Sequence, residues 1–199
     1  MVGYSVKGAS PLDGGERYDG AVMGQGSSRR RRVMSVIGQA GALAPSVEAE
    51  ARALGRAAVS AGFCVATGGR DGVMEAASRG AREAPEHRRG DVIAVIPGYD
   101  RDEANAYADL IIPTGLSLAR NVVLVAMADV VVAVAGGAGT LSEIALAWQL
   151  GRPVIALATT RGWAERLAGQ SLDDRRAGEV ISAPDPQRAV DAALAALSG

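Results

Sequence analysis

The chain has 199 residues, of which 48% are hydrophobic and 22% are charged, as is typical of one globular domain with a sizeable core. Its formal net charge of -1 provides no general attraction to nucleic acid or to an anionic membrane. With one cysteine, Cys64, and one histidine, His87, the chain excludes disulfides, Cys/His metal clusters and Ser-His-Asp catalysis. No apolar run approaches the ~20 residues of a membrane helix, and the polar N-terminus lacks a signal peptide, so we expect a cytoplasmic protein.

Lys7 is the only lysine among 21 basic residues, and it precedes the first periodic segment. A pyridoxal-phosphate enzyme needs a lysine for its Schiff base, and a P-loop needs one against the phosphates. The sequence therefore argues against a pyridoxal-phosphate-dependent lysine decarboxylase and against a P-loop nucleotidase.

Residues 1–31 are rich in Gly, Ser and Arg without an apolar period, which predicts a flexible N-terminal arm. The arginine run at 29–32 ends this arm and is interpreted as a solvated linker. The remaining residues, 32–199, are expected to form a single domain. Within it, Cys64 lies in an apolar strand pattern and is expected to pack there, whereas His87 is expected to be an exposed loop residue.

From Val33 onward, short β-rich runs alternate with helical patterns. This alternation predicts an α/β, Rossmann-like, doubly wound fold with a mainly parallel sheet and helices on both faces. The expected strands are 33–37, 63–66, 92–96, 110–112, 130–134, 154–158 and 180–181. The expected helices are 47–58, 72–84, 117–127, 141–150 and a last one after Pro186, with 161–177 irregular. Because 130–134 is continuously apolar, it is expected to be a central strand buried on both faces.

Three loops that follow expected strands are rich in glycine, and ligands of open parallel sheets bind at that edge. Glycine lets the backbone approach an anion, and helix N-termini supply free N–H groups. The sequence therefore predicts a phosphate site, with ligand contacts from Gly38, Gly41, Gly68, Gly69, Arg70, Gly136, Gly137, Gly139 and Thr140. For the first loop a merely tight turn is an equal alternative, and Arg70 either faces the phosphate or solvates the rim.

Glu143 and Arg120 are the two candidate catalytic residues. The segment 140–143 matches a capping box, so Glu143 has either a structural role or a role toward a sugar hydroxyl, a water or a developing cation. Arg120 lies among apolar residues near the start of an expected helix. A guanidinium there needs a negatively charged partner, either a bound anion or an acidic side chain in a structural ion pair.

The pattern argues against a nicotinamide dinucleotide site, because the first loop reads Gly-x-x-Gly rather than Gly-x-Gly-x-x-Gly. In addition, no acidic residue closes the second strand to hold a ribose, since the strand runs into Thr67 and Gly68.

With these residues in place, the chain from about Val33 to Leu157 resembles the LOG-like family, and within it the branch that includes molybdenum cofactor carrier proteins. The resemblance rests on Gly68-Gly69-Arg70-Asp71-Gly72-Val73-Met74-Glu75, on Arg120, and on Gly136-Gly137-Ala138-Gly139-Thr140-Leu141-Ser142-Glu143. The last segment looks like the family signature G-G-x-G-T-x-x-E.

LOG enzymes are phosphoribohydrolases that cleave the N-glycosidic bond of cytokinin nucleoside 5'-monophosphates. The resemblance implies that Gly137, Gly139 and Thr140 hold the 5'-phosphate, that Glu143 serves the ribose or its cationic transition state, and that Arg120 completes the site. It also implies a homodimer or homotetramer.

Three departures weaken the enzymatic interpretation. Asn121 stands where LOG enzymes usually have lysine after the arginine, Ala135 stands where they have proline, and Ser117-Leu118-Ala119 replaces a segment that usually contains Met-His. These changes fit the carrier-like branch better, in which the same fold binds a phosphorylated pterin.

Two hypotheses therefore stay open. The first is a carrier or sensor that binds a nucleoside monophosphate or molybdenum cofactor, requires no resident cofactor or metal, and has a small phosphorylated ligand as its partner rather than nucleic acid or membrane. The alternative is a nucleoside 5'-monophosphate phosphoribohydrolase.

Overall fold

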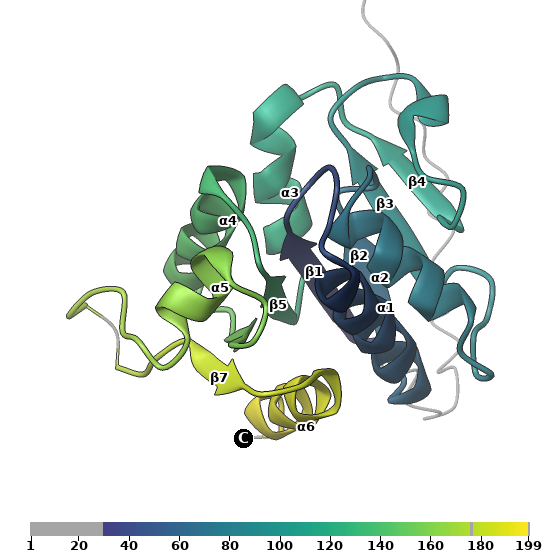
Figure 1. The fold of residues 1–199 in the computed structure, drawn as a ribbon. Coiled ribbons are helices and arrows are strands. Elements are labelled where there is room, and N and C mark those ends of the chain that lie inside the picture. Colours follow the sequence, from purple (N-terminus) through teal and green to yellow (C-terminus); the bar gives the residue numbers. More distant parts are fainter. Residues whose placement is uncertain (1–29, 176, 199) are drawn as a thin grey trace, which may run out of the picture. The chain divides into compact units, whose positions relative to one another are not determined.

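The computed structural model describes residues 30–175 and 177–198. Within these residues, seven parallel strands form one sheet in the order β4-β3-β2-β1-β5-β6-β7 (Figure 1). The strands are β1 Val33–Gly38, β2 Cys64–Thr67, β3 Val92–Ile96, β4 Leu110–Pro113, β5 Val130–Val134, β6 Val154–Leu157 and β7 Ile181–Ala183. The order reverses between β1 and β5, as in a doubly wound sheet, so the predicted fold class is confirmed.

Helices cover both faces of the sheet. They are α1 Pro45–Ser60, α2 Val73–Arg82, α3 Arg120–Ala126, α4 Ala138–Gln149, α5 Gly162–Leu167 and α6 Pro186–Ala196, with 3-10 turns η1 Arg101–Glu103 and η2 Ser117–Ala119. Helices α1, α2 and α6 pack on one face, around core side chains such as Leu54 and Val190. Helices α3, α4 and α5 pack on the other, around Leu124 and Ile144. Both faces of β5 are fully buried, as its continuous apolarity predicted.

Most differences from the expected elements are shifts of one to three residues at their ends, but two are larger. The expected helix 117–127 divides into η2 and α3, and Ser117 has a φ of 50°, so an α-helix does not begin at that residue. The stretch expected to be irregular contains α5, which is only 6 residues long. A helix this short shows no apolar period in the sequence. The residues at its start, Arg161 and Gly162, have left-handed backbone.

Helices α1 and α2 approach each other through two glycines. A Cβ on Gly55 would lie 2.0 Å from the carbonyl oxygen of Ala77, and a Cβ on Gly80 would lie 1.8 Å from that of Arg52. Both neighbours are backbone atoms, so they cannot move aside as a flexible side chain would. The close packing of these helices therefore depends on having no side chain at either position.

We expect Gly80→Ala to lower the free energy of unfolding by about 3 kcal/mol, because the added methyl forces the two helices apart. Urea denaturation followed by circular dichroism measures this. The matched control is Gly139→Ala in α4, where an added Cβ meets nothing within 4 Å. There, alanine should leave the stability unchanged or raise it by up to about 1 kcal/mol, because helix propensity favours alanine. Equal effects of the two substitutions would contradict the close-packing explanation.

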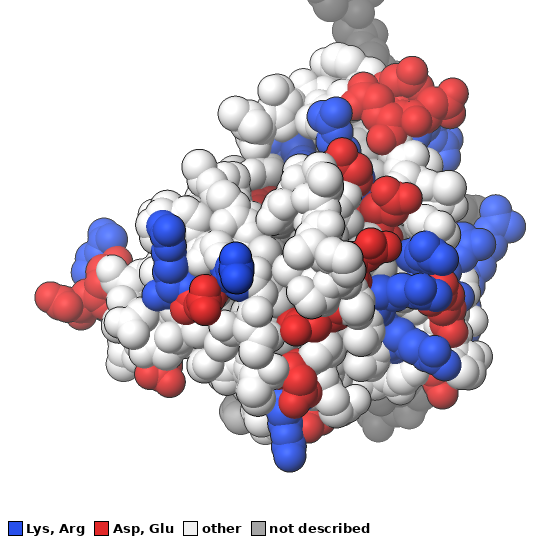
Figure 2. Space-filling view, viewed as in Figure 1, with Lys and Arg blue, Asp and Glu red and all other residues white. Residues whose placement is uncertain are grey.

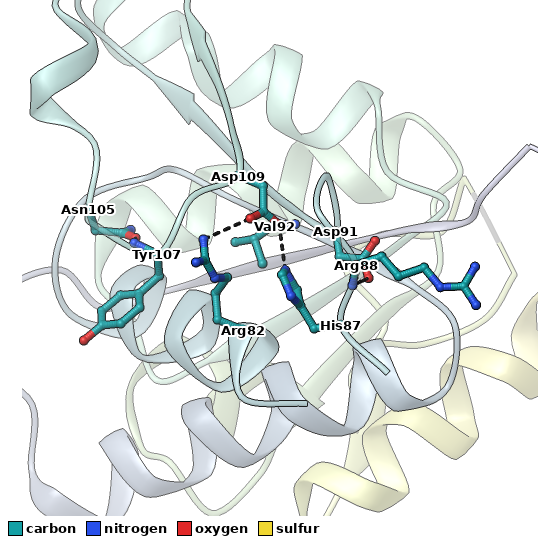
Figure 3. A network of polar contacts seen from close by, with 8 residues as sticks. All are labelled: Arg82, His87, Arg88, Asp91, Val92, Asn105, Tyr107 and Asp109. Atoms are coloured by element: carbon teal, nitrogen blue, oxygen red, sulfur yellow. Dashed lines mark hydrogen bonds and ion pairs between the residues drawn. The ribbon is translucent and has the colours of Figure 1, made fainter. Parts of the chain in front are cut away.

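A polar network joins the amino ends of β3 and β4 (Figure 3). His87 Nε2 lies 2.8 Å from one carboxylate oxygen of Asp109, and Arg82 donates to the other at 2.9 Å. Burial raises the pKa of Asp109, but the hydrogen bonds from His87 and from the Val92 N–H outweigh it and hold that pKa below its usual range. His87 lies in a loop as predicted, but the prediction that it is exposed is wrong, because its side chain is half-buried and bonded to Asp109.

The described part of the arginine run is also tied to the domain. Arg31 forms an ion pair with Asp91, whose side chain is buried, and Arg32 donates to the carbonyl oxygen of Leu197 at 3.1 Å. The interpretation of these two arginines as a solvated linker is wrong, since they fasten the chain just before β1 begins. The rest of the predicted arm, residues 1–29, lies outside the described residues.

Candidate functional site

A cavity of about 390 Å³ opens at the carboxyl ends of β1 and β2, between α3 and the N-terminus of α4. This is the edge of a doubly wound sheet where ligands bind, and the volume lies within the range of about 300–1,000 Å³ found for small-molecule sites. Seven of the predicted site residues line it, namely Gly38, Gly68, Arg120, Gly137, Gly139, Thr140 and Glu143.

The loop after β5 turns sharply to present the N-terminus of α4 to this cavity. Ala135 and Gly136 both have left-handed backbone, with φ of 53° and 98°. Gly137 is the N-cap, and no side chain of the described residues caps the helix. Added Cβ atoms on Gly137 and Gly139 would meet nothing within 4 Å, so the first turn stands open to a ligand. The first N–H groups of a helix without a cap, together with its dipole, form an anion site.

The capping-box interpretation of Glu143 is wrong. It required Thr140 to be the N-cap, but α4 begins at Ala138, so Thr140 already lies inside the first turn. Glu143 therefore lies one turn further along the helix, too far to reach back to the N-cap N–H. Its carboxylate lines the cavity instead, which removes the structural role that the sequence had left open.

Arg120 and Glu143 face each other across the cavity wall. Arg120 Nη1 lies 3.9 Å from Glu143 Oε1, and the two side chains are only 12% and 9% exposed. Burial raises the pKa of Glu143 to about 7, although the charge of Arg120 opposes the rise. Burial likewise lowers the pKa of Arg120, while Glu143 opposes this shift. The separation is that of a loose ion pair, with no hydrogen bond between the two groups.

The guanidinium of Arg120 has an unsatisfied donor. Among the described residues, its buried Nη1 has no hydrogen-bond partner. A buried charged donor without an acceptor is costly, so such a group points to an anion that completes the site. The structural ion pair that the sequence offered as the alternative is present only in part, since Glu143 remains beyond hydrogen-bonding distance.

Gly68 lines the cavity, as a ligand contact would, and it also has a second role. A Cβ at this position would lie 2.2 Å from Arg120 Nη1 and 2.6 Å from its Cζ. The glycine therefore makes room for the guanidinium, and it positions the arginine as well as lining the cavity. Gly38 is similarly constrained, because a Cβ there would lie 2.3 Å from the carbonyl oxygen of Val134.

Four of the predicted ligand residues do not line this cavity. Gly41 borders a separate hollow with Glu48 and Arg79, which agrees with the tight-turn alternative for part of the first loop. Gly69 packs against Ala94 and Ile96, and Gly136 packs against Thr140. Arg70 is exposed and borders another hollow with Glu103, so it occupies the rim, where its charge still helps to lower the pKa of Arg120.

Several residues that the sequence did not single out as ligand contacts complete the lining, namely Val36, Ile37, Gln39, Ala40, Met74, Leu118, Asn121 and Leu124. Asn121 follows Arg120 directly, and Gln39 lies inside the first glycine loop, so proximity to the motifs was a usable signal for both. The apolar members carry no such signal, because they look like ordinary core residues. The apolar members make most of the cavity lining apolar.

The surface around the site is not a uniform field of either sign. Figure 2 shows acidic side chains gathered at the top right of the drawn face, where the loop with η1 carries the exposed residues Asp100, Asp102 and Glu103. Asp71 and Glu75 border the two hollows beside the cavity. Arg120 and the N-terminus of α4, by contrast, line the cavity itself. Within the described residues, no cluster of three or more His, Cys, Asp or Glu side chains could hold a metal ion, and no helix is long and apolar enough to cross a membrane.

Because the pKa of Glu143 is raised, we predict that the free energy of unfolding decreases as the pH rises through this pKa. A carboxyl whose pKa is about 7 when folded and about 4.5 when unfolded stabilises the fold while protonated. That contribution is complete below pH ~4.5 and is lost as the pH rises through ~7. We therefore expect Glu143→Gln to match the wild type at pH 4 and to exceed it by up to about 3 kcal/mol at pH 8.5. Denaturant unfolding of both proteins at the two pH values measures this, and a difference that does not change with pH would contradict it.

Comparison with known proteins identifies the family to which this chain is similar. The model of the SLOG cluster4 family matches residues 31–190. A curated protein of Archaeoglobus fulgidus, described only as uncharacterized, is 41% identical over 96 residues, which are 48% of this chain and 60% of that protein.

Solved structures resemble the chain over most of its length. The X-ray structure of TM1055 has a TM-score of 0.74 at 36% identity, covering 81% of this chain and 97% of its own. The molybdenum cofactor binding protein of Rippkaea orientalis has a TM-score of 0.73 at 32% identity, covering 85% and 99%. The molybdenum cofactor carrier protein of Chlamydomonas reinhardtii has a TM-score of 0.73 at 34% identity, covering 85% and 100%. These matches confirm the resemblance to the LOG-like family and to its carrier-like branch.

Proposed function

This protein belongs to the SLOG cluster4 family, and we propose that it binds a small phosphorylated ligand, either a nucleotide or molybdenum cofactor, as a carrier or sensor. The observation that carries the proposal is the buried Arg120 Nη1, which lacks a hydrogen-bond partner among the described residues and lies in the cavity wall. An anionic group in the cavity would supply the missing acceptor.

The residues of the cavity suit both the phosphate and the flat ring of such a ligand. The phosphate would lie against the open first turn of α4 at Gly137 and Gly139, where backbone N–H groups and the helix dipole favour negative charge. Arg120 would neutralise a further phosphate charge with its planar guanidinium. The apolar lining residues that keep some exposed surface, such as Leu118 and Met74, would hold a flat nucleobase or pterin ring by burial of apolar surface.

The solved structures favour molybdenum cofactor among these ligands. Two of them are molybdenum cofactor binding or carrier proteins, at 32% and 34% identity and with nearly complete coverage of their own chains. The departures at Asn121 and Ala135 from the LOG enzyme pattern point the same way. In this role the protein needs no resident metal, because the molybdenum cofactor is its cargo.

Binding is tested by thermal shift and by isothermal titration calorimetry of the full chain with AMP, GMP and molybdenum cofactor. Adenosine is the matched control, because it lacks the phosphate that the α4 N-terminus would hold. A ligand present at 100 times its Kd should add about 2.7 kcal/mol to the free energy of unfolding, which raises Tm by several degrees. Absence of any shift with all three phosphorylated ligands would overturn the proposal.

The second candidate function is hydrolysis of a nucleoside 5'-monophosphate to free base and ribose 5-phosphate. One observation favours it, namely the carboxylate of Glu143 beside the cavity and 3.9 Å from Arg120. A glycosidic transition state is cationic at the sugar, so a nearby carboxylate would stabilise it. Incubation with AMP and with cytokinin monophosphates, followed by detection of free base, tests this function. Release by the wild type and loss in Glu143→Gln would support it, whereas equal inactivity of both proteins would leave only binding.

We also propose that the protein is a cytoplasmic homodimer or homotetramer. The edge strand β4 exposes Leu110 and Ile112, and the neighbouring segment exposes Leu116, Leu118 and Val122. An apolar area at a sheet edge is a common site of association between subunits. Light scattering after gel filtration measures the assembly. Ile112→Lys should shift it toward a monomer, and a monomeric wild type would overturn this part of the proposal.

A further inference from the structure

The turn that presents the α4 N-terminus is strained. Ala135 has a φ of 53°, although it is not glycine, and Gly136 follows it with a φ of 98°. Left-handed backbone is unfavourable for an alanine, so the surroundings must hold the turn in place. Ala135 is only 3% exposed, Gly136 is half-buried, and a Cβ at Gly136 would clash with the side chain of Thr140.

The segment after β6 supplies that restraint through three hydrogen bonds. Thr160 Oγ1 accepts from the Ala135 N–H at 2.8 Å and donates to the carbonyl oxygen of Leu157 at 2.8 Å. From the start of α5, the N–H groups of Trp163 and Ala164 donate to the carbonyl oxygens of Gly136 and Ala135, both at 3.0 Å. The turn is thus bonded through the N–H of Ala135 and through the carbonyl oxygens of both Ala135 and Gly136.

We propose that Thr160 is a positioning residue for the phosphate site, acting through Ala135 to aim the α4 N-terminus into the cavity. Thr160 itself does not line the cavity, and the residue is only 2% exposed. Its effect on a ligand must therefore pass through the turn at Ala135 and Gly136. The inference rests on the proposed function, since it concerns how the same site holds its anion.

The hydroxyl matters because no other group in the described turn satisfies the Ala135 N–H. When the Thr160 hydroxyl is removed, the buried N–H of Ala135 has no acceptor. The left-handed conformation of the turn then becomes less favourable than other conformations. The first N–H groups of α4 follow only two residues later, so a rotation at Ala135 redirects them. A misdirected anion site loses affinity even when the fold persists.

The test compares Thr160→Val with Thr160→Ser. Valine keeps the branched shape but removes the hydroxyl, whereas serine keeps the hydroxyl. The matched control is Thr159→Val, which removes the neighbouring hydroxyl, exposed and bonded only to Glu50 at 2.9 Å. Calorimetry gives the Kd of each protein for AMP and for adenosine, and for molybdenum cofactor if the wild type prefers it. Circular dichroism verifies that each variant is folded at the temperature of the titration.

We expect Thr160→Val to weaken AMP binding about tenfold, as the loss of one buried hydrogen bond predicts, with adenosine binding unchanged. Thr160→Ser and Thr159→Val should both bind AMP as the wild type does. A general loss of structure would weaken both ligands alike, so selective loss of AMP identifies the positioning role. Unchanged AMP binding in folded Thr160→Val would overturn the inference while leaving the proposed function intact.

If Thr160→Val does not fold, Gly162→Ala perturbs the same turn from outside the cavity. A Cβ at Gly162 would lie 2.6 Å from the Gly136 carbonyl oxygen, so it displaces the turn without touching the ligand. This variant should also weaken AMP binding about tenfold or more and spare adenosine. Equal AMP binding by Gly162→Ala and the wild type would overturn the positioning role. Failure of the wild type to bind either AMP or molybdenum cofactor would instead overturn the proposed function, on which the inference rests.

Discussion

Arg120→Ala should weaken the binding of AMP or molybdenum cofactor by about 100-fold or more. The substitution removes a buried cation from the cavity wall, and truncation of one partner in a desolvated charged contact typically has an effect of this size. It also removes the charge that opposes the rise in the pKa of Glu143, so this carboxyl becomes more fully protonated near neutral pH. Isothermal titration calorimetry at pH 7 measures the loss of affinity.

Arg70→Ala is the matched control for this prediction. Arg70 is exposed on the rim and does not line the cavity, so its removal should change the Kd less than about threefold. Arg120→Ala should retain a cooperative unfolding transition, because its Nη1 contributes no hydrogen bond to the described fold. Equal losses of affinity for the two arginine variants would mean that general surface charge, rather than the buried guanidinium, attracts the ligand.

Ala135→Pro should lower the free energy of unfolding by about 4 kcal/mol and remove ligand binding. Proline fixes φ near −65° and has no N–H, whereas Ala135 has a φ of 53° and donates its N–H to Thr160. The substitution therefore forces the turn to rearrange and leaves a buried hydroxyl without its donor. Denaturant unfolding measures the stability, and calorimetry with AMP or molybdenum cofactor measures the binding.

Ala138→Pro separates this conformational effect from the mere presence of proline. Ala138 is exposed at the first position of α4, where proline is favoured and no intrahelical bond is lost, and Gly137 before it is already extended. We expect nearly unchanged stability for this variant, together with weaker binding, because one of the N–H groups at the anion site is gone. If Ala135→Pro were as stable as Ala138→Pro, the left-handed turn would not be a requirement of the fold. The same result would also mean that having Ala135 where LOG enzymes have proline does not affect the fold.

The elements of this fold could be predicted wherever the chain repeats a pattern over enough residues. The helical period predicts α1 and the continuous apolarity of 130–134 predicts β5, and Gly151, with a φ of 70°, follows the end of α4. Helix α5 escaped prediction because 6 residues show no period. His87 was misplaced because its partner Asp109 is 22 residues away, and no local pattern reports such a pair.

The sequence by itself determined that this chain forms a doubly wound sheet and that its glycine loops, Arg120 and Glu143 belong to one family pattern. Those properties are local, since hydrophobic period, loop composition and motif spacing are all written in consecutive residues. Tertiary structure alone decided which of those residues share a cavity. It placed Arg120 against Gly68, set Glu143 one turn beyond the capping position, and bound Ala135 to Thr160 from a neighbouring loop. Each of these contacts joins separate βα units or depends on where a helix begins, and burial then sets the pKa of Glu143.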